Sequence, residues 1–155
     1  MEQKNLYIPG DLVMTNGVPL GTAEGVVYRV TVTDPNKTLR LKDGTVLKGV
    51  VCLENIGSAE LGDKGYLMCE CYAWVKDIVP IRLTIGTLQK NGYKKERIYY
   101  TNKFIPRIKL CTCEEGYEDK WSVSINGDII GGYIYHVHQL QHILFGLGLD
   151  SNIKL

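Results

Sequence analysis

The alternation of apolar and polar side chains over residues 7–56 predicts a run of short strands. The pattern is clearest where Val26, Tyr28, Val30 and Val32 alternate with a second set of side chains, Val27, Arg29, Thr31 and Thr33. Successive side chains of a strand point to opposite faces of its sheet. We therefore expect one set to be buried and the other to face water, as in an antiparallel meander.

Turn signals divide this part of the chain into its strands. Asn-Gly at 16–17 and Asp-Gly at 43–44 are typical of tight hairpin turns, because Gly, Asn and Asp tolerate a positive φ. The predicted strands are residues 11–14, 25–33, 38–41 and 45–53. The opening Gly-Asp-Leu-Val motif at 10–13, with strands this short, resembles the small SH3-like barrels. We expect residues 1–62 to form such a β-barrel or an open meander.

The first predicted helix covers residues 85–91, after a strand at 66–75 and a break at Pro80. Thr84 can cap the free amides of the first helical turn, while Leu83 and Leu88 are spaced to form a hydrophobic staple. Gly92 can adopt the left-handed conformation that ends a helix. The start and end signals therefore agree.

The second predicted helix covers residues 135–147 and follows the Gly131-Gly132 pair. Its apolar side chains recur every three or four residues and form one stripe: Val137, Leu140, Leu144 and Leu147. Strands are predicted before it at 97–101, 107–113, 120–125 and 128–130. The sequence therefore predicts an α+β fold, in which residues 63–155 add a smaller antiparallel sheet with two short helices, packed with the first part as one unit.

Composition limits the kind of protein this can be. A chain of 155 residues with 45% hydrophobic and 23% charged side chains is typical of a globular protein with a sizeable core. The first ten residues do not resemble a secretion signal, and no segment has the apolar length of a membrane span. Five cysteines, an odd number, favour reduced thiols over a disulfide framework. We expect a soluble cytoplasmic protein that does not bind membranes.

Two motifs resemble a family of small uncharacterised proteins. They are Pro-Ile-Arg-Leu-Thr, continuing to Leu-Gln-Lys-Asn-Gly-Tyr, at 80–93, and Val-His-Gln-Leu-Gln-His-Ile-Leu at 137–144. The family is encoded by gut Bacteroides-group bacteria, their phages and their conjugative elements. The resemblance implies an accessory protein of a phage or mobile genetic element, and it implies no particular activity.

His138 and His142 are spaced four residues apart on the second predicted helix, which is a spacing that metal-binding histidines use. A site needs a third ligand from elsewhere, and two histidines on a helix are more often surface or partner-contacting residues. We therefore predict no cofactor and no metal at this pair.

Two Cys-x-Cys pairs lie in predicted strands, at Cys69 and Cys71 and at Cys111 and Cys113. Each pair shares one face of its strand, so four sulfurs could meet if the two strands were neighbours. Structural zinc sites, however, usually place their cysteines on tight turns, and buried thiols often serve as small apolar residues. Core packing is the preferred interpretation, and for Cys52 it is the only one we consider.

A basic segment between residues 89 and 110 is interleaved with aromatic side chains, and Glu96 is its only acidic residue. Cations beside stackable rings are what binding of single-stranded nucleic acid uses. The candidate residues for this alternative function are Lys94, Lys95, Arg97, Tyr99, Lys103 and Arg107. Against it, the net charge of the chain is only +1, and acidic residues at 114–119 can neutralise the segment across a hairpin.

No nucleophile elbow, phosphate-binding loop or paired acid and base is present in the sequence, so we predict no enzyme. The preferred function is binding of a protein partner, including a second copy of the chain. The predicted contact surface lies on the second helix, where an aromatic ring among polar groups is typical of a contact anchor: His138, Gln141, His142 and Phe145.

Overall fold

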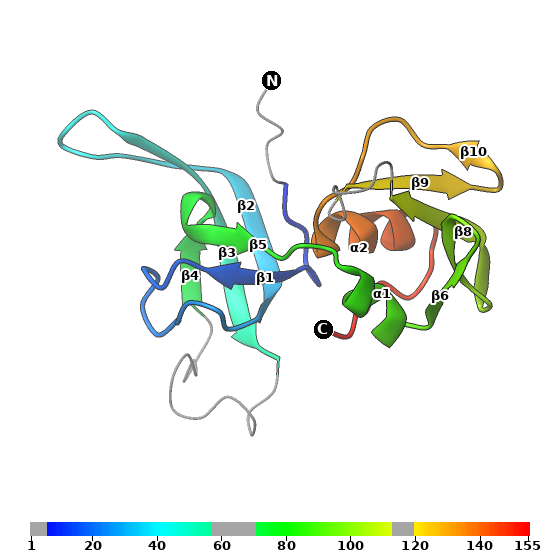
Figure 1. The fold of residues 1–155 in the computed structure, drawn as a ribbon. Helices are drawn as coiled ribbons and strands as arrows, with labels where there is room; N and C mark the ends of the chain where they lie inside the picture. The colour runs from blue at the N-terminus through cyan, green and yellow to red at the C-terminus, as the bar shows by residue number, and fades with distance from the viewer. Residues whose placement is uncertain (1–5, 57–70, 113–119) are drawn as a thin grey trace. The chain divides into compact units, whose positions relative to one another are not determined.

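The computed structural model describes residues 6–56, 71–112 and 120–155. The chain divides into two compact units, Met1–Ile81 and Arg82–Leu155, each built on a five-stranded antiparallel sheet (Figure 1). Two short helices, α1 and α2, belong to the second unit. The expected α+β class with antiparallel sheets is therefore confirmed. Neither helix has the length and hydropathy needed to span a membrane.

The first sheet has the strand order β4-β3-β2-β1-β5. Its edge strands β4 and β5 do not pair in the described part of the chain, so no closed barrel forms. The strands are β1 Leu12–Thr15, β2 Tyr28–Arg40, β3 Val46–Asn55, β4 Cys71–Trp74 and β5 Ile78–Pro80, and a 3-10 turn, η1, spans Val75–Asp77. One side of the sheet is buried by a cluster that includes Tyr7, Val13, Tyr28, Val51 and Leu53.

The predicted alternation holds for the first part of β2 and then fails. Tyr28 and Val30 are fully buried, but Val32 is 50% exposed. A register shift between Val30 and Val32 in the pairing of β2 with β3 explains this, because a shift of one residue turns a side chain to the other face. The two strands predicted at 25–33 and 38–41 are also one continuous strand, β2.

Of the turns predicted at 16–17 and 43–44, the second is confirmed. Gly44 has φ +90 and donates its amide to the Leu41 carbonyl at 3.0 Å, which closes the β2–β3 hairpin at Asp43-Gly44. Asn16-Gly17 does not form a two-residue hairpin, because β1 reaches β2 through residues 16–27. Asn16 instead donates through Nδ2 to the Asp77 carboxylate at 3.0 Å.

The boundary expected after residue 62 is wrong. β4 pairs with β3 and β5 pairs with β1, so residues 71–80 complete the first sheet. Ala73 and Ile78 bury their side chains in the first core, which explains why this segment folds with residues that precede it. The predicted strand at 66–75 is confirmed for Cys71–Trp74, and its beginning lies outside the described residues.

The second sheet has the order β10-β9-β8-β7-β6, and both helices lie on one side of it (Figure 1). Its elements are α1 Ile85–Lys90, β6 Tyr93–Glu96, β7 Tyr99–Asn102, β8 Ile105–Thr112, β9 Trp121–Ile125, β10 Asp128–Ile129 and α2 Val137–Gly146. Trp121 is fully buried, contacts Tyr100 edge to face at 5.5 Å, and donates from Nε1 to the Leu83 carbonyl at 2.8 Å. The indole thus joins the sheet to the segment that precedes α1.

The helix signals are confirmed. Thr84 Oγ1 accepts the amide of Thr87 at 3.2 Å, and Gly92, which follows the C-cap residue Asn91 of α1, has φ +85. In α2 the predicted stripe is buried at Val137, Leu140 and Leu144. The strand predicted at 97–101 is misplaced, because Arg97, with φ +58, lies in the tight turn between β6 and β7.

Candidate functional site

The predicted contact surface on α2 is not one exposed surface. His138 is 2% exposed and Gln141 is 3% exposed, whereas Phe145 is 64% exposed and His142 is half-buried. Gln141 Nε2 donates to the Ser151 carbonyl at 3.1 Å, so its amide is used inside the fold. The prediction that His138 and Gln141 contact a partner is therefore wrong, and of the four residues Phe145 alone is exposed.

The histidines of this region lie close together. The ring of His138 is 5.7 Å from that of His136 and 5.5 Å from that of His142, centroid to centroid. Burial, followed by the neighbouring His142 and His136, lowers the pKa of His138 to about 3. This imidazole is therefore neutral at neutral pH. Across residues 6–56, 71–112 and 120–155, no three His, Cys, Asp or Glu side chains converge as metal ligands.

The cysteines are divided between the two sheets. Cys71 lies in β4 of the first sheet and Cys111 in β8 of the second, so the neighbouring strands that a four-thiolate site requires are not formed. Cys69 and Cys113 lie outside the described residues. Cys52 is fully buried, which confirms its interpretation as a core residue.

The basic and aromatic segment forms the exposed face of the second sheet. Cross-strand pairing places Lys94 opposite Thr101, Thr101 opposite Lys109, and Lys109 opposite Ser124. A parallel row runs through Glu96, Tyr99, Cys111 and Ser122. The alternate positions Tyr100, Leu110 and Val123 are buried on the helix side. We call the two rows, with Lys103, Phe104 and Tyr133 at their margin, the outer face.

The aromatic rings of the outer face lie beside lysines. Lys109 Nζ is 5.7 Å from the ring centroid of Tyr99, and Lys103 Nζ is 4.8 Å from that of Phe104. Lys120 Nζ lies 4.1 Å from the ring of Tyr133. The rings are 38% (Tyr99), 80% (Phe104) and 42% (Tyr133) exposed. Positive charge and accessible aromatic surface therefore occur together on this face.

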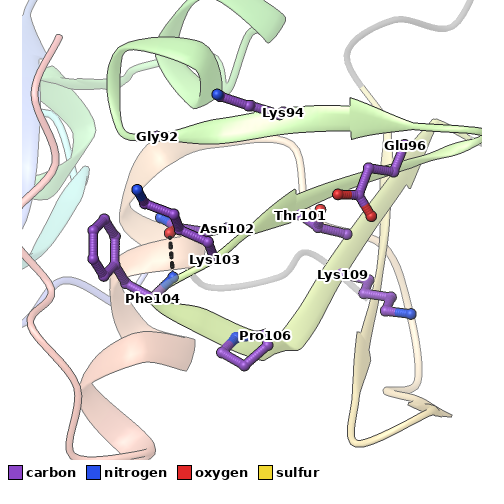
Figure 2. Close-up of a pocket in the computed structure, with 9 residues that line it drawn as sticks. All are labelled: Gly92, Lys94, Glu96, Thr101, Asn102, Lys103, Phe104, Pro106 and Lys109. Atoms are coloured by element: carbon purple, nitrogen blue, oxygen red, sulfur yellow. Dashed lines mark hydrogen bonds between the residues drawn. The ribbon is translucent and has the colours of Figure 1, made fainter.

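Among the described residues, Lys109 lines three open hollows on the outer face, two larger ones and a smaller one at the β6–β7 turn. The first has a volume of about 480 Å³ and is drawn in Figure 2; its lining comprises Gly92, Lys94, Glu96, Thr101, Asn102, Lys103, Phe104, Pro106 and Lys109. Within it, Asn102 Oδ1 accepts the Phe104 amide at 3.0 Å and so holds the turn that presents Phe104 (Figure 2). The second hollow, of about 680 Å³, includes Tyr99, Cys111, Ser122, Ser124 and Tyr133.

The structure brings together only some of the residues predicted for nucleic-acid binding. Lys94, Tyr99 and Lys103 lie on the outer face. Lys95 is paired with Tyr100 and so alternates to the other side of the sheet. Arg97 lies in the β6–β7 turn, where it lines a hollow of about 270 Å³ together with the outer-face residues Glu96, Tyr99, Thr101 and Lys109. Arg107 donates from Nη2 to the Leu147 carbonyl at 3.4 Å, at the end of α2, which gives it a structural role.

The sequence prediction left out several residues of the outer face. Lys109 and Phe104 lie in the basic segment but were not among its candidate residues, and Ser122, Ser124 and Tyr133 come from later in the chain. Strand alternation could have identified Lys109. It is two residues from Cys111 on the same strand, so the two side chains point to the same face. Comparison of the chain with protein-family models, with curated proteins and with solved structures finds no match.

Proposed function

We propose that the protein binds single-stranded nucleic acid on the outer face of the second sheet. The observation that supports this most directly is the row of Lys94, Thr101, Lys109 and Ser124, which runs beside the exposed ring of Tyr99. Binding of single strands combines cations that neutralise phosphates with rings on which bases stack. Both are present on one face, and neither helix covers it (Figure 1).

Each group on the outer face has a role in this proposal. Lys94, Lys103 and Lys109 contact phosphates, while Tyr99, Phe104 and Tyr133 stack on bases. The hydroxyl groups of Thr101, Ser122 and Ser124 can donate to sugar or base oxygens. Glu96 is the only carboxylate of the outer face as described; the acidic residues at 114–119 lie outside the described residues.

The resemblance to proteins of phages and conjugative elements suits an accessory protein that handles nucleic acid. We propose this cellular context, together with an SH3-like fold for the first unit. The strand order β4-β3-β2-β1-β5 supports the fold, as does the 3-10 turn between β4 and β5. Binding of a protein partner through His138 and Gln141 is not part of the proposal, because both side chains are buried.

Fluorescence anisotropy with a labelled strand of about 20 nucleotides, longer than one typical single-strand site, tests the proposal. Lys94→Gln with Lys109→Gln lowers the net charge by two, and the exposed Lys154→Glu is a control with the same charge change. We expect the double variant to bind roughly tenfold more weakly. The slope of the logarithm of its association constant against the logarithm of the salt concentration should fall in magnitude by about 1.4, at roughly 0.7 for each phosphate contact.

Stacking is tested separately. Tyr99→Ala should cost about 1 to 3 kcal/mol of binding free energy, whereas Tyr99→Phe keeps the ring and should bind as the wild type does. Absence of salt-dependent binding by the wild type at about 50 mM salt would contradict the proposal. Equal loss in the double variant and in Lys154→Glu would also contradict it, because overall charge would then explain the effect.

A further inference from the structure

The hairpin of β2 and β3 extends beyond the rest of the first sheet. β1 pairs with β2 only at Tyr28 and Arg29, and β4 pairs with β3 only from Val50 to Leu53. Residues 34–48, which we call the arm, therefore form a ribbon with no third strand among the described residues (Figure 1). Apart from the half-buried Leu47, every residue of the arm is exposed. An isolated two-stranded ribbon is only marginally stable in water, and its exposed edges favour pairing with another molecule.

The two faces of the arm differ in character. Cross-strand pairing places Thr38 opposite Lys48, Leu39 opposite Leu47, and Arg40 opposite Val46. Because side chains alternate, Arg40 and Lys48 share one face with Thr38 and Val46, while Leu39 and Leu47 share the other. The first face is therefore basic.

An aromatic hollow lies at the base of the arm, and Lys37 is the one cation among its described lining residues. Val50 is opposite Trp74 and Cys52 is opposite Tyr72. Gly49, with φ +84, and the register shift between Asp34 and Thr38 separate these pairs from the basic face of the arm. A hollow of about 440 Å³ lies here, lined by Val32, Asp34, Lys37, Val50, Tyr72, Ala73 and Trp74. The ring of Tyr72 is 72% exposed. Lys37 thus lines the same hollow as the accessible ring of Tyr72.

Charge favours an anionic ligand at this place. The arm carries four cations, Lys37, Arg40, Lys42 and Lys48, against two carboxylates, those of Asp34 and Asp43. Asp34 Oδ1 already accepts the amides of Asn36 at 3.2 Å and Lys37 at 3.1 Å, so its role is to shape the bulge in β2. An acidic peptide would be attracted by the same cations, but its side chains would not stack on Tyr72 and Trp74. Bases do stack on such rings.

We infer that the first unit has a second surface for single-stranded nucleic acid, with phosphates at Lys37, Arg40 and Lys48 and bases on Tyr72 and Trp74. This arm surface extends the proposed function to the first unit, but it rests on a different set of residues. Two separate surfaces on one chain raise the affinity for a strand that can reach both, because the second contact becomes intramolecular.

The experiment uses five proteins: the wild type, an arm variant, the outer-face variant Lys94→Gln with Lys109→Gln, the combination of the two variants, and a charge control. The arm variant is Arg40→Gln with Lys48→Gln, and Lys154→Glu again matches its charge change. All are titrated against the labelled strand of about 20 nucleotides. We expect each double variant to bind roughly tenfold more weakly than the wild type, and the combination to lose salt-dependent binding.

The two proposals fail in different ways. The arm surface is refuted if the arm substitutions leave strand binding unchanged, both in the otherwise wild-type protein and in the outer-face variant. The proposal for the outer face would still stand in that case. Tyr72→Ser should weaken binding while Tyr72→Phe should not; equal loss in both would refute stacking at the arm. Displacement of the strand by poly-glutamate at equal charge concentration would show a general anion site and overturn the inference.

The leucine face of the arm suggests a competing role, self-association of two copies of the chain. Leu39 is 47% exposed and Leu41 is 39% exposed, as they would be if two copies of the arm packed together. Light scattering of the wild type and of Leu39→Ser decides this. A dimer that dissociates in Leu39→Ser, together with wild-type strand binding by the arm variant, would make the arm a self-association element and refute the inference.

Discussion

Lowering the pH should destabilise the second unit through one buried imidazole. Burial, with the neighbouring His142 and His136, lowers the pKa of His138 from 6.5 to about 3. The unfolded chain therefore takes up a proton at this residue below pH 6.5, whereas the folded chain does not until near pH 3. Stability is fully present above pH 6.5 and is lost progressively as the pH falls toward 3. The pKa of His136 is also lowered, by burial and by Arg82, and acts in the same direction.

The size of the effect follows from the proton linkage. Each pH unit in this range costs about 1.4 kcal/mol for one group that is protonated only in the unfolded state. Between pH 7 and pH 5, His138 should lower the free energy of unfolding by about 2 kcal/mol. Above pH 5 most carboxylates stay ionised, so the window isolates the histidines.

Urea unfolding at pH 7, 6 and 5 measures this slope. The chain has two tryptophans, and in a Trp74→Phe background the emission of the buried Trp121 reports on the second unit alone. His138→Gln removes the titrating group. The slope of its unfolding free energy against pH should therefore be smaller than that of its parent, by about 1.4 kcal/mol per pH unit. Equal slopes in His138→Gln and its parent would show that His138 is not the responsible group and would refute the reasoning.

The remaining predictions concern the ends of α1. Thr84→Ala should lower the free energy of unfolding by about 1 kcal/mol, because the Thr87 amide loses its acceptor, and Thr84→Ser should restore it. Asn91→Ala removes bonds to the Thr87 carbonyl, at 2.8 Å, and to both backbone groups of Lys154, at 2.7 and 2.8 Å. At roughly 1 kcal/mol for each bond we expect a loss of about 3 kcal/mol and faster hydrogen exchange of the Lys154 amide. Unchanged exchange in Asn91→Ala would contradict this.

Local signals in the sequence predicted the elements that depend on their own residues. The α1 caps at Thr84 and Gly92 and the turn at Asp43-Gly44 are contained in a few consecutive side chains, and the structure has all three. The turn at Arg97 carries no such signal, since a basic residue with φ +58 is uncommon. For that reason the sequence does not predict the strand Tyr93–Glu96, and it places the next strand at 97–101 instead of Tyr99–Asn102.

Long-range pairing could not be predicted from the same patterns. The partners of β4 and β5 are set by burial of Ala73 and Ile78 in the first core, which no local period reveals. The burial of His138 and Gln141 likewise depends on how the unit closes around α2. In the outer face, alternation alone identifies which residues share a side, but only the register places Ser124 beside Lys109.

Hydrogen bonds join the beginning of the second unit to its end. Leu83 donates its amide to the Tyr135 carbonyl at 2.9 Å, and its own carbonyl accepts from Trp121. Asn91 binds the backbone of Lys154. During synthesis, some sixty further residues must therefore be translated before Asn91 can form its bonds to Lys154. A translational pause in that interval would leave Leu83 and Leu88 exposed to water and to chaperones, so the order of synthesis itself becomes a hazard for this unit.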